Sequence, residues 1–531
     1  MDDQPNATPA AAMSAPESQS HAPQAGGVKE TIESILIAFI LAFIFRAFVV
    51  EAFVIPTGSM APTLLGAHIR FDCKECGYTF DLNYSAGAQS SEDINIPAFA
   101  QGRKEGVCPN CGYVEAVSNA PIRYGDRILV LKYLYLFQQP QPWDVVVFKA
   151  PLGEPYQQNY IKRLIGVPGE SVLILDGDIY TAQHGATEAE DFRIRRKTPD
   201  AQQALWRLVY HNDYFPRGST ARTRPFEQPW RQRRGQSGWQ LTQSLDDPRS
   251  FIFDGLDKQA SIYFDKDCNP YKRALTDWLA YDNEAQPAST LQYVSDLKLD
   301  LYYTRREGDG PLQLKLSKRD DTFIAEFTPH GVALKHSRFG VAEAQVLSER
   351  AMSFSSGRPY HVQFVNVDYR VSLLIDGELV LQTTDEQYQP DPRRLIEEYV
   401  DGHAAPPPAI EITAANQRCE LSHVALWRDV YYLNRDVSRR GMTFWASPGN
   451  VIHLGEDEYF VLGDNSPISE DARYWERGIS LPDEDLAVES GRVPGRFLLG
   501  KAFFVYWPAG YPLVGSSPAI VPNFGEMRFI H

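Results

Sequence analysis

The sequence predicts a mainly β protein with one apolar N-terminal helix and more than one folded unit. The chain has 531 residues, whereas single hydrophobic cores stop growing at about 250 to 300 residues. It contains 37 prolines and 37 glycines, which favour many strands and turns over long helices. Its 43% hydrophobic and 12% aromatic residues are enough to fill real cores.

The net charge of the chain argues against one class of binding partner. The formal charge is -16 at pH 7. Binding to nucleic acid needs a basic patch that releases counterions from phosphates. The composition therefore predicts no nucleic-acid partner.

The N-terminal region begins with a polar tail and continues as an apolar segment. Residues 1–27 are rich in Ala, Pro, Ser and Gln and cannot bury enough surface to offset their ordering entropy, so we expect a disordered tail. Residues 35–45 form an unbroken apolar run, and apolar character resumes after Arg46. With Arg46 reaching toward the interface, the segment attains the roughly 20 residues that a bilayer needs. We expect a transmembrane anchor over residues 28–54.

Two other readings of this segment are weaker. A cleaved secretion signal would have a basic start and a small-residue exit, but only Lys29 precedes the run and Glu51 follows it. A buried amphipathic helix would be polar on one face, whereas this run is apolar on every face. A single lysine specifies orientation poorly.

A candidate nucleophile follows the apolar segment. Ser59 lies between Gly58 and Met60, with Pro56 and Pro62 on either side. The prolines fix the backbone and the glycine permits close approach, so this turn can present the hydroxyl and leave the serine amide available to an oxyanion. An ordinary turn serine has the same local pattern.

A serine without a histidine partner can use a neutral lysine, provided that burial lowers the pKa of the lysine. Two strands are expected at residues 143–149 and 160–166, joined by a loop with Pro and Gly. Lys162 lies in the second, between Ile161 and Leu164. Lys149 is the competing candidate, and the local residues do not decide between the two.

Four segments together resemble the boxes of the type I signal peptidase family, which uses a Ser/Lys dyad. They are residues 55–60 (IPTGSM), 124–126 with 143–148 (YGD and WDVVVF), 160–163 with 166–169 (YIKR and GVPG), and 463–473 (GDNSPISEDAR). The resemblance covers the anchor and roughly residues 53–69, 117–185 and 445–510. It implies a membrane-bound endopeptidase that removes signal peptides from preproteins after small residues (Ala-X-Ala sites). It also implies the cytoplasmic membrane, with the catalytic domain on the extracytoplasmic side, and no catalytic cofactor.

The resemblance also implies roles for individual residues. Ser59 would be the nucleophile and Lys162 the general base, and Thr57 would supply an oxyanion donor together with the Ser59 amide. Ser469 would orient the lysine. Asp471 and Arg473 would pair beneath it, although a surface ion pair is the alternative. The positions matching the family's substrate pockets are Phe53, Ile55, Met60, Val147, Tyr160 and Ile161.

The last box departs from the family's usual sequence pattern. Ser466-Pro467-Ile468 stands where acidic and amide residues are usual, and Ala472 replaces a common serine. Ser469, Asp471 and Arg473 are retained, so an active enzyme is still expected.

Two Cys-x-x-Cys-Gly-Tyr segments lie between the first two boxes. They contain Cys73, Cys76, Cys108 and Cys111. Two such knuckles can supply four thiolates to one structural zinc ion, as in a zinc ribbon. Two disulfides or a redox pair are the alternatives.

The stretch from about residue 186 to 444 turns strongly β. Leu312, Leu314 and Leu316 alternate with polar residues, and residues 360–369 and 370–381 predict consecutive strands with an Asp-Gly turn. The segment resembles a concanavalin-like or laminin-G-like jelly roll. Such a sandwich could bind an envelope polysaccharide or a protein, or act as a spacer. Cys268 and Cys419 in it could form a disulfide or stay as buried thiols.

The expected organisation follows from these segments. A signal-peptidase catalytic domain comprises residues 55–69, 116–185 and 445–531. A zinc-ribbon-like insertion occupies 70–115, a connecting segment 186–229, and a β-sandwich insertion 230–444. The competing function is a membrane-tethered binding scaffold with a vestigial protease shell. A self-cleaving repressor would also use Ser and Lys, but it would need a DNA-binding domain and no anchor.

Overall fold

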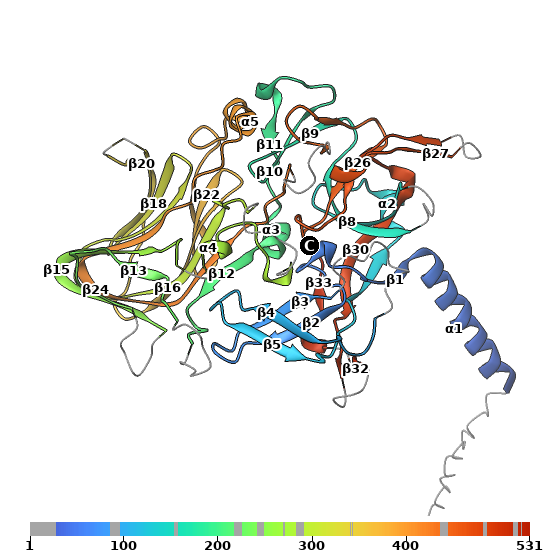
Figure 1. Cartoon of the computed structure of the whole chain (residues 1–531), viewed down its shortest axis with the longest axis horizontal. Helices are drawn as coiled ribbons and strands as arrows, with labels where there is room; N and C mark the ends of the chain where they lie inside the picture. The colour runs from blue at the N-terminus through green and yellow to red at the C-terminus, as the bar shows by residue number, and fades with distance from the viewer. Residues whose placement is uncertain are drawn as a thin grey trace, which may run out of the picture. The chain divides into compact units, whose positions relative to one another are not determined.

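The computed structural model describes most of the chain as two compact units, one ending at Val49 and one beginning at Val50 (Figure 1). The described residues are 28–84, 96–152, 158–216, 226–241, 249–268, 271–282, 291–339, 341, 343–435, 444–481, 486–512, 519–521 and 523–531. The tail predicted over residues 1–27 lies outside them. The expectation of a mainly β protein is confirmed, since strands far outnumber helices in the described residues.

The first unit contains helix α1 (Val28–Phe48). The predicted anchor over residues 28–54 needs correction at its end, because Val50–Val54 is strand β1 and not helix. Among the described residues, no helix is long and apolar enough to cross a membrane.

In the second unit, an eight-stranded antiparallel sheet collects three distant parts of the sequence. It is here called the catalytic sheet after the catalytic domain that the sequence predicts. Its apolar strands pack into cores on both faces. Their order is β1 (Val50–Val54), β6 (Arg127–Leu131), β30 (Leu498–Trp507), β7 (Val145–Lys149), β8 (Asn159–Gly166), β26 (Glu458–Leu462) and β29 (Val493–Pro494), with β33 (Arg528–Phe529) on β30.

A four-stranded sheet continues from the catalytic sheet, since β9 follows β8 after a short turn. Its order is β11 (Arg193–Ile194), β10 (Asp178–Gln183), β9 (Glu170–Leu175) and β25 (Ile452–His453). Four two-stranded pairs complete the small elements: β2 (His68–Asp72) with β3 (Thr79–Asn83), β4 (Arg103–Val107) with β5 (Val114–Ser118), β27 (Ile479–Leu481) with β28 (Leu486–Val488), and β31 (Tyr511–Pro512) with β32 (Ala519–Val521). The edge strand β11 is followed by helix α3 (Pro199–Leu205), which Thr198 caps by accepting from the Ala201 amide.

The large insertion forms a thirteen-stranded antiparallel sheet that curves around one core, seen in green to orange in Figure 1. Its main path is β20 (Gln345–Ala351), β19 (Gly331–Arg338), β18 (Asp321–Thr328), β17 (Leu312–Lys318), β24 (Ile410–Arg428), β16 (Leu297–Glu307), β21 (Pro359–Val367), β22 (Arg370–Ile375) and β23 (Glu378–Gln382). Strands β12 (Arg207–His211), β13 (Trp230–Gln232), β14 (Trp239–Gln240) and β15 (Phe251–Phe264) pair beside this path. Short helices α2 (Leu134–Phe137), α4 (Tyr271–Ala274) and α5 (Pro392–Val400) lie in connections.

Local sequence explains much of this sheet. Leu312, Leu314 and Leu316 are fully buried, so the predicted alternation is confirmed. Asp376 and Gly377 both have positive φ between β22 and β23, which is the geometry of a type I′ hairpin turn. Because β12 pairs with β24, the large sheet begins inside the segment that we expected to be a connection.

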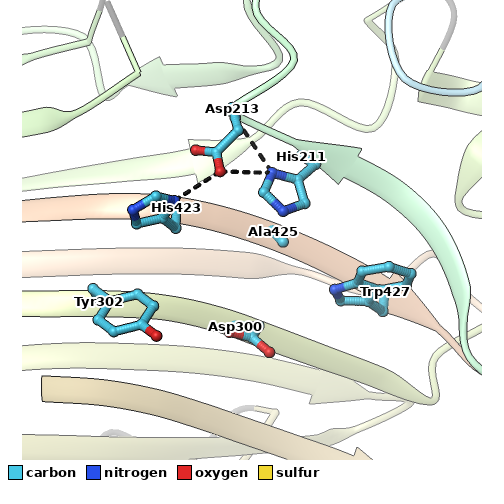
Figure 2. Close-up of a pocket in the computed structure, with 7 residues that line it drawn as sticks. All are labelled: His211, Asp213, Asp300, Tyr302, His423, Ala425 and Trp427. Carbon is cyan, nitrogen blue, oxygen red and sulfur yellow. Dashed lines mark hydrogen bonds and ion pairs between the residues drawn. The ribbon is translucent and has the colours of Figure 1, made fainter. Parts of the chain in front are cut away.

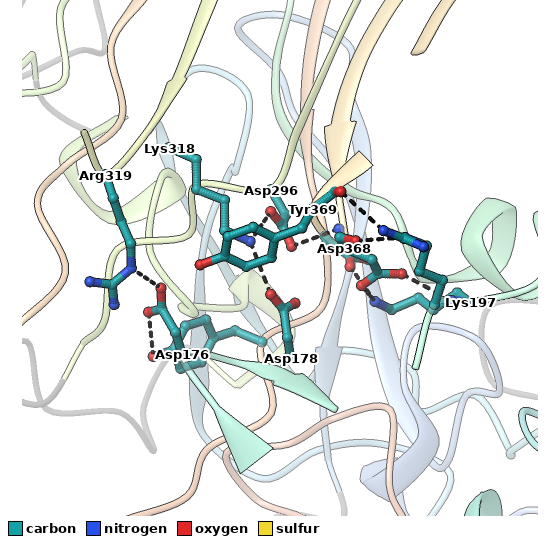
Figure 3. A network of polar contacts seen from close by, with 11 residues as sticks. Asp176, Asp178, Lys197, Asp296, Lys318, Arg319, Asp368 and Tyr369 are labelled. Atoms are coloured by element: carbon teal, nitrogen blue, oxygen red, sulfur yellow. Dashed lines mark hydrogen bonds and ion pairs between the residues drawn. The ribbon is translucent and has the colours of Figure 1, made fainter. Parts of the chain in front are cut away.

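A buried ionic network joins the large insertion to the four-stranded sheet (Figure 3). Lys318 at the end of β17 donates to Asp178 of β10 (2.9 Å) and to Asp296 (2.5 Å). Lys197 contacts Asp368 (2.5 Å) and Asp429 (2.7 Å). All these side chains are nearly inaccessible to solvent, so the network fixes the insertion against the fold that carries the catalytic sheet.

Candidate active site

Ser59 lies in a short 3-10 turn, η1 (Gly58–Met60), that follows β1. This turn is here called the nucleophile turn, after the role that the sequence predicts for Ser59. Buried Ile55 and Met60 anchor it in the core beneath the catalytic sheet. The Asn465 backbone N–H donates to the Ser59 carbonyl (3.1 Å), and the Asn465 side-chain amide donates to the Gly58 carbonyl (3.0 Å). Hydrogen bonds from Asn465, in the last of the four boxes, therefore fix the backbone of the first box.

Lys162 reaches the same place from β8. Its Nζ donates to Ser59 Oγ over 2.9 Å and to the Ile161 carbonyl over 3.0 Å. Of the two lysines that the sequence left open, Lys162 is thus the one that contacts Ser59. Lys149 lies on β7 opposite Asn159, three pairs along the ladder.

Burial changes the acidity of Lys162. Its side chain is enclosed, and the residue is 4% exposed. Desolvation of the ammonium lowers the pKa of Lys162 to about 8, against the opposing charges of Asp471 and Asp464. A lysine with this pKa has a large neutral fraction near pH 8 and can accept a proton.

Ser469 is 1% exposed and lies close to the Ser59 backbone, since a Cβ on Gly463 would approach both Ser469 Oγ and the Ser59 carbonyl oxygen. Its Oγ is in contact with the backbone of Gly463, where a Cβ would come within 2.1 Å. Within the described residues this hydroxyl has no hydrogen-bond partner. The position therefore has a buried polar group with capacity for one more contact.

Asp471 and Arg473 form a fully buried ion pair, with Nε to Oδ1 and Nη2 to Oδ2 both 2.8 Å. Asp471 Oδ2 also accepts from the Gly463 backbone N–H (2.9 Å). The alternative of a surface ion pair is therefore wrong. Because two charge-assisted bonds fix the pair, it shapes the loop that carries Ser469.

A second buried ion pair was not singled out from the sequence. Arg163 binds Asp464 through two bonds of 2.7 Å, and neither side chain is accessible to solvent. Arg163 is the neighbour of Lys162, so this pair ties β8 to the same loop. Arg163 and Asp464 lie inside two of the boxes in the sequence (YIKR and GDNSPISEDAR), but nothing in those segments pairs the two residues.

Thr57 precedes the nucleophile turn as its N-cap residue, and its side chain makes no capping bond. Gly66 packs directly on Thr57, since a Cβ there would lie 2.3 Å from the Thr57 carbonyl carbon. Early N–H groups of a helical turn have no acceptor within the turn, and the Ser59 N–H is one of these. The Ser59 N–H thus has no acceptor within the turn, and Thr57 lies two residues before Ser59 in the sequence.

Five of the six expected substrate-pocket residues share one cluster, and the sixth, Tyr160, belongs to another. Ile55, Met60 and Val147 are buried in one cluster, and Phe53 and Ile161 pack against it. Tyr160 belongs to the neighbouring cluster, where it contacts Phe148, and its ring lies 5.2 Å from Lys162 Nζ.

The large insertion reaches the back of the nucleophile turn, which the sequence did not indicate. A Cβ on Gly58 would lie 2.5 Å from Cε1 of Tyr281 and 3.0 Å from Nδ2 of Asn83. Asn83 donates to Asp282 (3.4 Å), and burial raises the pKa of Asp282 to about 7. Tyr281 is buried with Ala61, Leu65 and Leu279.

The four cysteines of the two knuckles converge. Cys73 and Cys111 Sγ are 3.6 Å apart, as are Cys76 and Cys108 Sγ, and all four sulfurs lie within 4.8 Å of one another. A disulfide needs about 2.05 Å, whereas Zn–S bonds of about 2.3 Å give sulfur separations of about 3.8 Å in a tetrahedron. The spacing fits a four-thiolate metal site. Cys268 and Cys419 are buried, and neither is in a disulfide.

The chain matches known proteins over these same regions. The family model "Signal peptidase, peptidase S26" matches residues 28–81, 114–222 and 372–507, more than half of the chain. A signal peptidase I of Rickettsia typhi is 28% identical over 153 residues, 29% of this chain and 43% of that protein. A signal peptidase I of Rickettsia bellii is 27% identical over 148 residues, 28% of this chain and 37% of that protein. The chain spans less than half the length of these curated relatives.

The solved structures that resemble the chain are similar to a smaller part of it. The carbohydrate binding module CBM66 from Bacillus subtilis covers 37% of this chain and 94% of its own, at 12% identity and a TM-score of 0.24. The Caenorhabditis elegans galectin LEC-6 covers 24% and 84%, at 15% identity and a TM-score of 0.16. Scores this low carry no weight for function. On the match to the family model, the chain belongs to the signal peptidase family, peptidase S26.

Proposed function

We propose that this protein is a signal peptidase I, an endopeptidase that removes N-terminal signal peptides from exported preproteins with Ser59 as nucleophile and Lys162 as base. The observation that carries the proposal is the 2.9 Å contact between Lys162 Nζ and Ser59 Oγ, with the lysine enclosed. The alternative of a binding scaffold with a vestigial protease shell is not favoured, because both dyad residues and the buried Asp471–Arg473 pair are present.

The proposed reaction is acyl transfer in two steps. Neutral Lys162 takes the Ser59 proton while Oγ attacks the carbonyl carbon of the last signal-peptide residue. The resulting oxyanion accepts hydrogen bonds from the Thr57 hydroxyl and the Ser59 N–H. The Lys162 ammonium then protonates the leaving amine. Water, deprotonated by Lys162, hydrolyses the ester and releases the signal peptide.

In this proposal the remaining residues orient the dyad or contact the substrate. The Ser469 hydroxyl, which has no hydrogen-bond partner among the described residues, is the acceptor that orients the Lys162 ammonium when that ammonium forms during the reaction, and the Asp471–Arg473 pair fixes the Ser469 loop. Phe53, Ile55, Met60, Val147, Tyr160 and Ile161 line shallow apolar pockets that accept small side chains, as in Ala-X-Ala sites. No cofactor takes part in the chemistry.

Cleavage of a preprotein by the purified full chain in detergent tests this assignment. Ser59→Ala and Lys162→Ala are each expected to abolish cleavage. Lys149→Ala is the matched control, since it changes a lysine on the adjacent strand. Full activity in either dyad variant contradicts the proposal.

We further propose that Cys73, Cys76, Cys108 and Cys111 hold one structural zinc ion. Two tight turns supply two thiolates each, and the closed set of four leaves no open position for catalysis. Metal analysis of the purified protein should find one zinc per chain. The absence of zinc together with no titratable thiols in the knuckles would favour disulfides.

The proposed site of action is the cytoplasmic membrane, with the catalytic unit on the extracytoplasmic side. The support is the apolar run at residues 35–45 within helix α1. Membrane fractionation with external protease tests it: the chain should sediment with membranes and be digested from the extracytoplasmic side. A chain recovered in the soluble fraction would contradict it.

A further inference from the structure

A pocket of about 300 Å³ opens on the outer face of the large sheet. Its lining residues lie later in the sequence than Ser59 and Lys162. Figure 2 shows its residues on three neighbouring strands: His211 and Asp213 at the end of β12, Asp300 and Tyr302 on β16, and His423, Ala425 and Trp427 on β24. Their neighbours Val424 and Leu426 point into the sandwich core. The pocket is therefore a surface feature and not a packing defect.

The small side chain of Ala425 creates the hollow. In the strand register Ala425 lies between His211 on one side and Asp300 on the other. Its methyl group is the smallest side chain in the row, so the larger residues around it form walls over an alanine floor.

Irregular backbone directs the wall residues inward. The β16–β24 register shifts between Asp300 and Tyr302, and His423 on the bulged strand has a φ of +53°. The β12–β24 register shifts between Leu208 and Tyr210, just before His211. Bulges of this kind redirect side chains next to binding sites.

Two carboxylates face the hollow as oriented acceptors. Asp300 accepts from His361 (2.8 Å) and from Gln363 (2.7 Å). Asp213 Oδ2 is 2.7 Å from His423 Nδ1. These contacts orient each carboxylate, and each carboxylate keeps lone pairs for further donors.

His211 supplies a donor to the same space. The Asp213 backbone N–H donates to His211 Nδ1 (3.3 Å), so the proton of the neutral ring is on Nε2. Burial lowers the pKa of His211, which favours that neutral form. The imidazole therefore offers one N–H donor.

Aromatic rings form the ends of the pocket. Tyr302 stacks on His361 (4.8 Å) and meets His423 edge-on (5.3 Å). Trp427 is backed by Lys298, whose Nζ lies 5.2 Å from the indole and 5.0 Å from that of Trp206. These contacts hold both rings in place beside the hollow.

We propose that this pocket binds a neutral saccharide. A pyranose ring carries hydroxyl donors for Asp213 and Asp300, hydroxyl acceptors for His211, and apolar C–H faces for Trp427 and Tyr302. Two carboxylates repel an anionic ligand. In the part of the chain that the structure describes, two groups of side chains bring three or more possible ligand atoms close enough to share a metal ion. They are the four knuckle cysteines, and Asp178 with Asp296 and Asp368. The described residues of this pocket do not form such a group.

The test uses the purified full chain in a detergent without a sugar headgroup, since an alkyl maltoside would compete. Methyl glycosides of glucose, galactose and mannose and their neutral oligosaccharides are titrated by calorimetry and by saturation-transfer NMR. At least one is expected to bind, with saturation transferred to its C–H protons. Trp427→Ala and Asp300→Asn are each expected to weaken binding by at least about tenfold.

Ala425→Leu is the decisive variant, because it fills the floor of the pocket and is expected to abolish binding. Ala333→Leu is its matched control: it makes the same change on β19, where Val332 and Leu334 are buried and Ala333 is half-exposed. The control should bind as wild type. The proposal is overturned if no glycoside binds at high millimolar concentration, if Ala425→Leu binds undiminished, or if zinc binds the pocket and His423→Ala removes it.

Discussion

A Cβ atom on Gly463 would lie 2.1 Å from Ser469 Oγ, so the backbone of Gly463 and the side chain of Ser469 are in direct contact. The same Cβ would lie 2.5 Å from the carbonyl oxygen of Ser59. The missing side chain at Gly463 thus allows the nucleophile turn and the Ser469 loop to approach each other. This contact connects two boxes that are 400 residues apart in the sequence.

Gly463→Ala is expected to reduce preprotein cleavage by about a hundredfold or more. The added methyl group must displace Ser469 or the Ser59 carbonyl, and a shift of about 1 Å near the chemistry costs rates of this order. The measurement is kcat/KM on a purified preprotein, with circular dichroism to establish the fold. Gly525→Ala is the control, since its Cβ would meet nothing closer than Asn523 Oδ1 at 3.6 Å. Equal activity in the two variants would contradict the contact.

Tyr281→Ala is expected to lower kcat by about tenfold to a hundredfold with a smaller change in KM. The tyrosine ring supports Gly58 from behind, so its loss leaves a cavity next to Ser59 and loosens the nucleophile rather than the substrate pockets. Tyr281→Phe keeps the ring and should keep most activity. Unchanged kcat in Tyr281→Ala would show that the insertion does not position the turn.

Lys318→Met is expected to destabilise the protein by about 3 kcal/mol. The ammonium stands between Asp178 and Asp296 inside the structure, and removing it leaves two carboxylates buried without their cation. The measurement is the urea midpoint of unfolding followed by tryptophan fluorescence. Lys335→Met, which removes a partly exposed lysine from its pair with Glu326, should change stability by about 0.5 kcal/mol at most. Equal midpoints for the two variants would contradict the role of the network.

Local patterns in the sequence predicted the elements that depend on neighbouring residues. The alternation at Leu312 to Leu316 predicted a half-buried strand, and Asp376-Gly377 predicted a hairpin turn, because each depends on a few adjacent residues. The end of the N-terminal helix was placed too late. Residues 50–54 (VEAFV) are mostly apolar, a composition that suits both a membrane helix and a strand. Pairing with β6 decides for the strand.

Relationships between distant segments could not be read from the residues alone. Lys149 and Lys162 both lie in apolar strands, and only the arrangement of β8 against the nucleophile turn distinguishes them. Tyr281 and Asp282 lie more than 200 residues from Ser59 in a segment with no motif. The residues of the ionic network are likewise spread from position 178 to position 429, so tertiary packing alone brings them together.

The pH dependence of kcat/KM for preprotein cleavage tests the central claim most directly. Burial lowers the pKa of Lys162 to about 8, and only the neutral amine can take the Ser59 proton. Activity should therefore rise with pH through a single step near pH 8 and be lost below it as the amine becomes protonated. A profile that rises only near the ordinary lysine value of about 10.4, or one without any step between pH 6 and pH 10, would contradict the account.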